Sequence, residues 1–216
     1  MNWARLRHIP WVDTRARFVA ATPVGGALLD LGTAEGETLS HIAELRPDLR
    51  LFAVDKSGPP EMCPANCQFQ AINLEKDKWP WPDESMDAIT SFHLVEHLSD
   101  LSLMLSEARR VLKPNGRIYF ETPHPKSLVL SSSLNTRVPL NFFDDLTHVR
   151  IVTIGGLAHH VRAAGLEASA HGTARNWLFA ATWPFFMFLP ESRKKITARL
   201  HWLGWSAYLI ARRCKM

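Results

Sequence analysis

The sequence predicts an α/β fold in which helices cover a doubly wound, mostly parallel sheet. Two observations indicate this fold. Short apolar or β-patterned runs alternate with segments of helical period through the middle of the chain. The first of these runs passes through a glycine-containing turn directly into a helical pattern, which is how such sheets hold a ligand at the carboxyl ends of their strands. With 216 residues, the chain is long enough for one domain with a sizeable core.

The turn after the first strand is the most informative stretch. It reads A-L-L-D-L-G-T-A-E-G from Ala27, and Gly32 and Gly36 suit positions where a positive φ or a close approach excludes a Cβ. A dinucleotide fingerprint would require glycine where the chain has Ala34 and Glu37. The pattern is therefore D-x-G-x-x-x-G. We interpret it as a ligand-binding turn, with a strand–turn–helix that binds nothing as the alternative.

The second strand is predicted over Leu49–Asp55, after a helix that follows Gly36 and is ended by Pro47. Its last residue, Asp55, lies 23 positions after Gly32. This is near the spacing of about 20 residues at which a carboxylate binds ribose hydroxyls in a βαβ unit. Asp55 is therefore a candidate sugar ligand, and a surface acid at a strand end is the alternative.

The remaining elements follow from the same patterns. Strands are predicted at Cys67–Ile72, Met86–Phe92, Arg117–Thr122, Leu166–His171 and Ser206–Arg212, and helices at Thr14–Ala21, at Ser99–Lys113 and from Thr153 to Ala164. The segment 125–149 breaks this rhythm, and an irregular insertion at the carboxyl edge is where a substrate lid belongs. Trp177–Pro190 is the most apolar stretch and is too short to span a bilayer. Because basic residues follow it, we interpret it as an interfacial segment. A hydrophobic flap over the substrate and a dimer contact are the alternatives.

Composition and charge indicate the compartment and the partners. Three cysteines are too few for a disulfide framework, and no continuous apolar run follows the basic N-terminus, so we expect a cytoplasmic protein without a secretory signal. Residues 1–26 carry a net charge of +3, residues 27–174 of −6 and residues 175–216 of +7. A nucleic-acid-binding domain would instead surround its site with a basic face. The basic ends suit contact with an anionic membrane surface.

Four segments resemble the class I S-adenosylmethionine-dependent methyltransferases, in particular the small type 11/23-like group. The glycine turn resembles motif I, usually D-x-G-x-G-x-G, with Ala34 in place of the middle glycine. W-P-W-P-D-E-S-M-D, which ends at Asp87, resembles the L-P-F-P-D-x-S-F-D lead-in to strand four, and E-A-R-R-V-L-K-P-N-G-R-I-Y-F-E-T-P resembles the stretch around strand five. D-L-T-H-V-R, which ends at Arg150, resembles the group's D-x-T-H-x-R segment. The resemblance implies a Rossmann-like fold with an antiparallel last strand, S-adenosylmethionine as cofactor, and methyl transfer.

The resemblance also assigns candidate residues to the cofactor. The first turn would shape the methionine pocket, Asp55 would bind the ribose, two residues after strand three would bind the adenine, and His93 would border the methyl group. The residues of the methionine pocket are Asp30, Gly32, Thr33 and Gly36, and those at the adenine are Asn73 and Leu74. A plain polar turn is the alternative for Asn73, and a packed loop histidine is the alternative for His93.

His124 and His148 are the candidates for a general base, because an imidazole near its unperturbed pKa accepts a proton readily. A structural or substrate-orienting role is the alternative for each, and methyl transfer needs no base where positioning suffices. His93–His97 reads H-x-x-E-H, the inverted zinc-protease motif. That motif needs both histidines on one helix, whereas this stretch directly follows a β-patterned run, so no metal is expected.

We expect a single domain over residues 1–216. It would comprise an N-terminal cover (1–26), a cofactor-binding core (27–174) with its lid (125–149), an apolar and basic insertion (175–205) and the last strand (206–212). The predicted function is S-adenosylmethionine-dependent methyl transfer to a small-molecule or lipid-linked acceptor, without a nucleic-acid partner and with peripheral membrane contact through residues 177–199. The alternatives are an RNA methyltransferase and a non-catalytic, membrane-associated module on the same fold.

Overall fold

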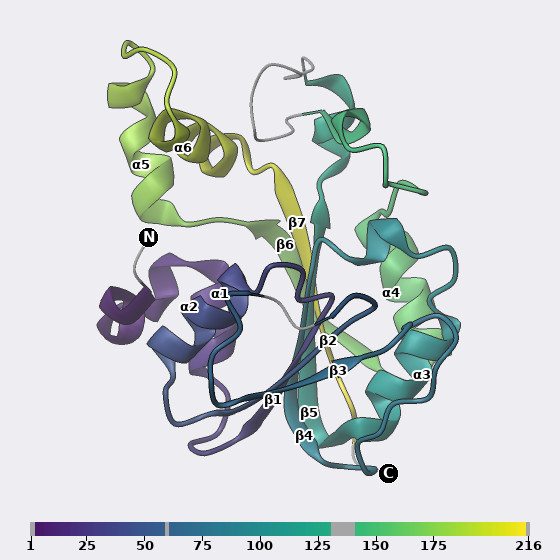
Figure 1. Ribbon diagram of the computed structural model, residues 1–216. Helices are drawn as coiled ribbons and strands as arrows, with labels where there is room; N and C mark the ends of the chain where they lie inside the picture. The colour runs from purple at the N-terminus through teal and green to yellow at the C-terminus, as the bar shows by residue number, and fades with distance from the viewer. Residues whose placement is uncertain (1–2, 59–60, 131–140, 215–216) are drawn as a thin grey trace.

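The structure is a computed structural model that describes residues 3–58, 61–130 and 141–214. Its strands are β1 (Ala27–Leu31), β2 (Arg50–Asp55), β3 (Cys67–Ala71), β4 (Met86–Phe92), β5 (Leu112–Pro123), β6 (Glu167–Ala174) and β7 (Ser206–Arg212). They form a seven-stranded sheet in the order β3-β2-β1-β4-β5-β7-β6 (Figure 1). The pairs among β1 to β5 are parallel, and β7 is antiparallel to both of its neighbours. The predicted fold class, including the antiparallel last strand, is confirmed.

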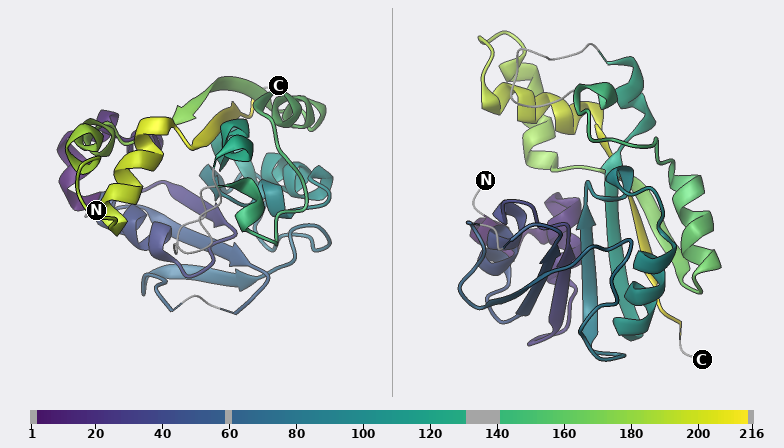
Figure 2. Two further views of the ribbon diagram at one scale, coloured as in Figure 1. Left: turned by 90° about the horizontal axis from the view of Figure 1, so that it is seen from above. Right: turned by 45° about the vertical axis from the view of Figure 1, so that its right-hand side comes forward.

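Helices cover both faces of this sheet. The α-helices are α1 (Thr14–Ala20), α2 (Glu37–Leu45), α3 (Ser102–Val111), α4 (Ile154–Ala163), α5 (Trp177–Phe186) and α6 (Arg193–Leu203). Short 3₁₀ helices are η1 (Trp3–His8), η2 (Pro10–Val12), η3 (Val95–His97), η4 (Pro125–Val129) and η5 (Phe142–Asp144). Helices α1 and α2 lie on one face, α3 and α4 lie on the other, and α5 and α6 project beyond the sheet (Figures 1 and 2).

Alternate residues of the strands enter two apolar cores, one on each face. Leu29, Ile89 and Phe120 belong to the core under α3 and α4, whereas Leu28 and Tyr119 belong to the core under α1 and α2. Side chains of a strand alternate between faces, and a parallel strand that is covered on both faces reads as a continuous apolar run. This explains why the first strand shows no alternation of apolar and polar residues in the sequence.

The predicted boundaries of α3 and β5 differ from the structure. The helix predicted over Ser99–Lys113 begins at Ser102 and ends at Val111, and the strand begins at Leu112 rather than Arg117. Met86 pairs with Leu112 and Ala88 pairs with Arg117, so the four residues between them bulge from the ladder. Pro114 lacks the N–H that a helix would use, and Asn115 adopts a positive φ of 65°. Residues 113–116 thus form a bulge inside the strand.

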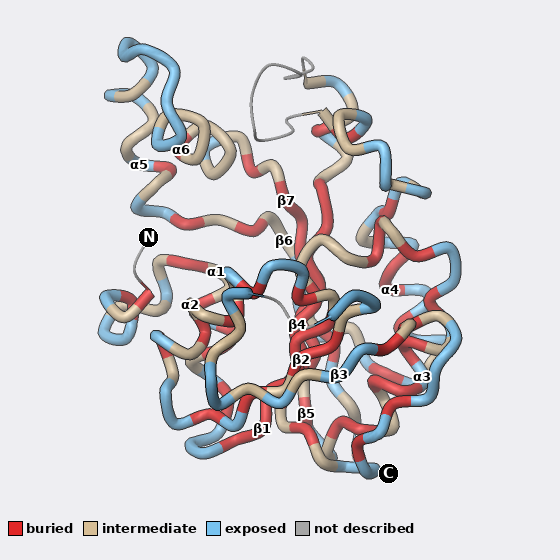
Figure 3. The backbone as a smooth tube through the Cα atoms, viewed as in Figure 1, coloured by how far each residue is buried: buried red, intermediate tan, exposed pale blue. Residues whose placement is uncertain are grey.

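The apolar and basic insertion (175–205) before the last strand contains a helical hairpin, α5 and α6. Helix α5 begins behind the N-cap Asn176 and contains Pro184, and α6 begins behind the N-cap Ser192. Much of this hairpin is exposed or half-buried, in contrast to the buried strands (Figure 3). Of the predicted lid 125–149, residues 131–140 lie outside the described residues, and the remainder forms η4, η5 and the loop that follows η5.

The N-terminal segment is fixed to the sheet by buried polar contacts. Asp13 accepts hydrogen bonds from the backbone of Arg15 and Ala16 as the N-cap of α1, and it also accepts one from Asn176 Nδ2 at 2.8 Å. The Arg15 guanidinium contacts Glu121 of β5 with two hydrogen bonds, Nε to Oε2 at 2.8 Å and Nη2 to Oε1 at 2.5 Å. This pair joins residues that are 106 positions apart, and it holds the cover against the carboxyl edge.

Replacing Arg15 by methionine should destabilise the protein, because the Glu121 carboxylate, 1% exposed, would lose the two hydrogen bonds and the charge of the guanidinium and keep only His93 as a cationic neighbour. We expect the free energy of unfolding to fall by about 3 kcal/mol, as measured by urea denaturation at pH 7. Adding Glu121→Gln should recover part of this loss, since an amide needs no counter-charge. Arg17→Met, on the exposed side of the same helix, is the control. Equal effects of the two methionine variants would contradict the proposed role of the pair.

Candidate active site

The turn between β1 and α2 has the backbone that the glycine pattern predicts. Gly32 and Gly36 have φ of +69° and +83°, and Ala34 between them has a φ of +47°. A Cβ on Gly32 would lie 2.7 Å from the side chain of Leu94, and one on Gly36 would lie 3.0 Å from the backbone of Cys63. The positive φ favours glycine at both positions, and at Gly36 the backbone of the neighbouring segment also leaves little room for a Cβ. Gly36 caps α2 without a side-chain hydrogen bond, so the first-turn N–H groups suit an anionic ligand.

Asp55 lies at the end of β2 and contacts this same turn. Its Oδ2 accepts a hydrogen bond from the backbone N–H of Ala34 at 3.0 Å, and its Oδ1 accepts one from Ser57 at 3.1 Å. An ionised carboxylate has about four acceptor positions, so each oxygen retains capacity for a hydroxyl donor. The carboxylate and the glycine turn thus adjoin, as a nucleoside site at the carboxyl edge requires.

Asp30 is part of the sheet interior rather than of an open surface. Its side chain is 2% exposed and accepts a hydrogen bond from Thr90 Oγ1 at 2.7 Å across the β1–β4 pair. Burial raises the pKa of Asp30 to about 6, against the hydrogen bonds from Thr90 and Thr33, which lower it. Thr33 also donates to the Asp30 carbonyl at 3.3 Å. Both residues therefore shape the turn from below.

The residues predicted at the adenine lie directly after β3. The Asn73 side-chain oxygen accepts a hydrogen bond from the backbone N–H of Glu75 at 3.0 Å, while its own backbone N–H donates to Asp77 at 2.7 Å. Leu74 is 5% exposed and belongs to the core under α3 and α4. These contacts describe an ordered polar turn, and the contact of either residue with adenine stays a prediction.

His93, directly after β4, joins two buried carboxylates. Its Nδ1 lies 3.2 Å from Glu96 Oε1, and its Nε2 lies 3.4 Å from Glu121 Oε1 and 3.3 Å from Ser206 Oγ. Burial by itself would lower the pKa of His93, but the hydrogen bonds to Glu121 and Glu96 outweigh it and raise the pKa to about 9. The ring is therefore an imidazolium at neutral pH and cannot accept a further proton.

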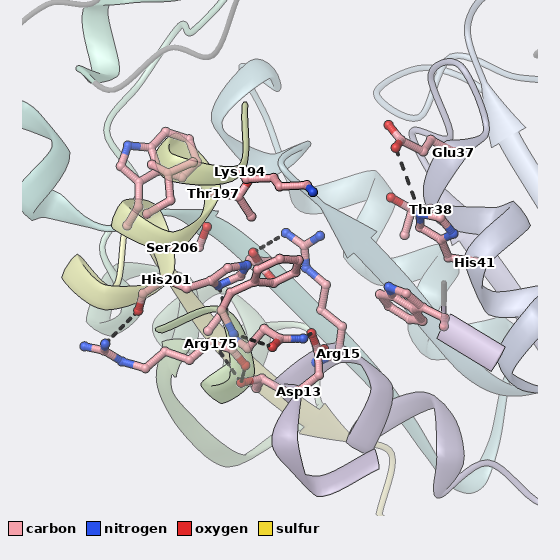
Figure 4. Close-up of a pocket in the computed structure, with 18 of the residues that line it drawn as sticks. Asp13, Arg15, Glu37, Thr38, His41, Arg175, Lys194, Thr197, His201 and Ser206 are labelled. Carbon is pink, nitrogen blue, oxygen red and sulfur yellow. Dashed lines mark hydrogen bonds and ion pairs between the residues drawn. The ribbon is translucent and has the colours of Figure 1, made fainter. Parts of the chain in front are cut away.

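A pocket of about 1130 Å³ lies between the N-terminal segment and α2 on one side and the α5–α6 hairpin on the other (Figure 4). His93 and Glu121 line it where the strands end, and Phe179, Phe186 and Trp205 supply apolar surface. Figure 4 labels ten of the lining residues, namely Asp13, Arg15, Glu37, Thr38, His41, Arg175, Lys194, Thr197, His201 and Ser206. The pocket therefore combines an apolar wall with a dense set of polar groups.

His124 and His148 do not line this pocket. The His124 Nδ1 accepts a hydrogen bond from the backbone N–H of Lys126, and partial burial together with the charge of Lys126 lowers the pKa of His124. His148 lies on the loop after η5, where its Nδ1 is 2.7 Å from the carbonyl oxygen of Phe142. Both candidate bases thus lie outside the pocket lining, and a catalytic role for either stays a prediction.

Several residues of the pocket were not singled out from the sequence. Glu121 could have been found from the sequence, because it is an acidic residue near the carboxyl end of a predicted strand. Arg15 and His201 come from the two ends of the chain and have no such local signal. Burial, and then the charge of Arg15, lower the pKa of His201 to about 4, so this ring is neutral. Its Nδ1 accepts a hydrogen bond from the backbone of Asn176 at 3.1 Å.

Comparisons with known proteins agree with this geometry. The sequence profile of a family described as "Methyltransferase domain" matches residues 3–171. A probable S-adenosylmethionine-dependent methyltransferase of Mycolicibacterium smegmatis is 35% identical over 88 residues, which cover 41% of this chain and 31% of that protein. A demethylmenaquinone methyltransferase of Roseiflexus castenholzii is 29% identical over 119 residues, covering 52% and 49%. The chain thus spans less than two thirds of the length of these relatives.

Solved structures share the fold. A putative methyltransferase of Haloferax volcanii, in a complex with the Trm112 methyltransferase activator, aligns with a TM-score of 0.66 at 18% identity and covers 99% of this chain and 96% of that one. An S-adenosylmethionine-dependent methyltransferase of Mesorhizobium loti aligns with a TM-score of 0.63 at 16% identity, covering 96% and 98%. The predicted resemblance to class I methyltransferases is confirmed, and S-adenosylmethionine is the cofactor that family and fold imply.

The raised pKa of His93 predicts a pH-dependent contribution to stability. A group with a folded-state pKa above its unfolded value of about 6.5 stabilises the fold fully below that value, and the effect disappears as the pH rises through 9. The stability difference between the wild type and His93→Asn should therefore shrink by up to roughly 3 kcal/mol between pH 6 and pH 10. Urea unfolding at several pH values measures it, with exposed His171→Asn as the control. A pH-independent difference would disprove the assignment.

Proposed function

The chain belongs to the methyltransferase domain family, and on that basis we propose that it transfers a methyl group from S-adenosylmethionine to a small-molecule or lipid-linked acceptor. The observation that carries this proposal is the adjacency of three features at one edge of the sheet. These are the glycine turn with Asp55, the loop after β4, where the side chain of Leu94 would lie 2.7 Å from a Cβ on Gly32, and the large pocket. His93 lines this pocket, and so do Glu37 and Thr38 directly after the turn. A cofactor on the turn would thus present its reactive end toward the pocket.

Each part of the cofactor has a matching group in this chain. Asp55 would accept the ribose hydroxyls, and the N–H groups at the start of α2 would bind the carboxylate of the methionine moiety. Gly32 and Gly36 would allow the close approach. When bound, S-adenosylmethionine supplies an electrophilic methyl group on a sulfonium.

The chain's own residues would act by positioning the acceptor. His93 is protonated at neutral pH because Glu96 and Glu121 hold it so, and it can donate a hydrogen bond but cannot act as a base. Positioning of two reactants at contact distance accounts for large rate enhancements without proton transfer. An acceptor that is already nucleophilic, or that loses its proton after attack, suits this site best.

The pocket supports an acceptor with an apolar part. Its volume of about 1130 Å³ lies above the usual range of 300–1,000 Å³ for small-ligand sites. Trp3, Phe179, Phe186 and Leu200 contribute apolar lining. The similar protein of Roseiflexus castenholzii is a demethylmenaquinone methyltransferase. Its name supports the proposal of a lipid-linked acceptor for this chain.

Replacement of Asp55 by alanine should weaken the binding of S-adenosylmethionine about 10- to 100-fold, because a charged acceptor for the ribose hydroxyls is lost. Isothermal titration calorimetry on the full chain measures the dissociation constant. Asp83→Ala removes an exposed carboxylate that lies before β4, away from the turn, and should leave binding unchanged. Equal affinities of the Asp55 and Asp83 variants would contradict the ribose assignment.

Cofactor titration, together with an RNA-binding measurement, distinguishes the proposed enzyme from a non-catalytic module and from an RNA methyltransferase. No binding by the wild type at millimolar S-adenosylmethionine would favour a non-catalytic module on the fold. An RNA methyltransferase would bind the cofactor and would also bind RNA with an affinity that falls steeply with salt concentration.

The α5–α6 hairpin supports peripheral contact with an anionic membrane. Phe185 is 77% exposed, Phe188 is 82% exposed and Leu189 is 51% exposed, and exposed Arg193 and Lys194 begin the next helix. Aromatic side chains beside basic ones favour the headgroup region of anionic lipids. No helix among the described residues is long and apolar enough to cross a membrane. We therefore propose contact through residues 177–199 at the mouth of the pocket.

Replacement of both Phe185 and Phe188 by serine should reduce partitioning onto vesicles at least about tenfold, because two apolar side chains no longer leave water. Co-sedimentation with phosphatidylcholine vesicles containing phosphatidylserine measures this partitioning. Val24→Ser is the control, since Val24 is 91% exposed but precedes β1 at the opposite edge of the sheet. If the double variant and the control sediment alike, or if phosphatidylserine has no influence, the membrane contact is wrong.

A further inference from the structure

Three side chains outside the pocket bring metal-ligand atoms together. Glu96 and His97 belong to η3, directly after β4, and His148 belongs to the loop after η5. One ligand atom from each residue lies within 4.8 Å of those of the other two. The two segments are joined by the backbone N–H of Val149, which donates to the carbonyl oxygen of Glu96 at 3.0 Å.

The hydrogen bonds of both histidines leave Nε2 as the coordinating atom. His97 Nδ1 lies 2.9 Å from Thr147 Oγ1, whose hydroxyl donates its proton to Asp145, and 3.2 Å from the carbonyl oxygen of Thr147. His148 Nδ1 lies 2.7 Å from the carbonyl oxygen of Phe142. A carbonyl oxygen only accepts hydrogen bonds, so each Nδ1 carries the proton and each Nε2 carries a lone pair. A backbone carbonyl that fixes the tautomer in this way is the usual outer partner of a metal-binding histidine.

Glu96 supplies an independent observation. Its side chain is fully buried, and its Oε1 is bonded to His93 Nδ1. The other oxygen, Oε2, is buried and has no hydrogen-bond partner within the described ranges. The guanidinium of Arg150, whose backbone N–H lies 3.4 Å from the Glu96 carbonyl oxygen, forms no ion pair with this carboxylate among the described residues. A buried carboxylate oxygen without a partner is unfavourable and requires an explanation.

We propose that Glu96, His97 and His148 bind a divalent first-row transition cation, with Zn²⁺ the best-suited ion. Two imidazoles and one carboxylate are a known donor set for such ions. Asp145, whose Oδ2 lies 3.7 Å from His148 Nε2, adds negative charge at the site. The ion would tie the loop after η5 to the end of β4. This departs from the expectation of no metal, yet it is not the zinc-protease arrangement, because His93 is held by Glu96 and Glu121 instead.

Calorimetric titration of the chelator-treated full chain with ZnCl₂ tests this site. We expect one ion per chain, and at least a tenfold loss of affinity in each of Glu96→Gln, His97→Gln and His148→Gln, because each removes one ligand. Zn²⁺ should also raise the melting temperature of the wild type but not of these variants. His160→Gln is the matched control, since it removes an exposed imidazole on α4 that lies outside the cluster.

Titration with CoCl₂ gives a second readout, because the visible absorption of bound Co²⁺ reports its coordination. Circular dichroism of each variant checks the fold, and if Glu96→Gln fails to fold, the two histidine variants decide. The proposal is overturned if the wild type binds no Zn²⁺ at micromolar concentrations. It is equally overturned if His160→Gln lowers the affinity as much as His97→Gln and His148→Gln do.

Discussion

The arrangement of this protein depends on the partly buried ion pair between Arg15 and Glu121. Glu121 stands at the end of β5 and contacts Arg15 from the cover, Tyr119 from its own strand and His93 from the end of β4. Arg15 and His93 keep the pKa of Glu121 well below its usual range, although burial alone would raise it. A carboxylate in such a place is tolerated only with good geometry and several partners. The pair therefore determines how the N-terminal segment sits over the carboxyl edge and forms one wall of the pocket.

The same edge of the sheet gives three carboxylates three different environments. Asp55 accepts a hydrogen bond from the backbone of the glycine turn, and Asp30 is buried in the sheet with a raised pKa. Glu96 bonds His93 through one oxygen, and its other oxygen is buried without a partner among the described residues. Environment, rather than residue type, decides what each carboxylate can do.

The sequence predicts best what depends on local pattern. The bounds of β4 and β7 agree with the predictions because a strand leaves a short, regular signal in apolar and β-branched residues. The glycine turn and its link to Asp55 follow from a motif within one βαβ unit. The α5–α6 hairpin could not be predicted in this way, because its first helix is apolar on all sides and contains Pro184. The contacts of Glu121, and the meeting of His97 with His148, join distant segments and leave no local signal.

The position of β7 has a consequence for the order of assembly. This strand is the last in the chain, yet it is inserted between β5 and β6 and supplies the ladder partners of both. During synthesis β6 therefore has no neighbour in the sheet until β7 has emerged. The α5–α6 hairpin, which connects the two strands, cannot take its final place before then. Nascent chains would thus expose an unpaired strand and an aromatic hairpin together, a combination that favours aggregation or capture by chaperones until the final strand arrives.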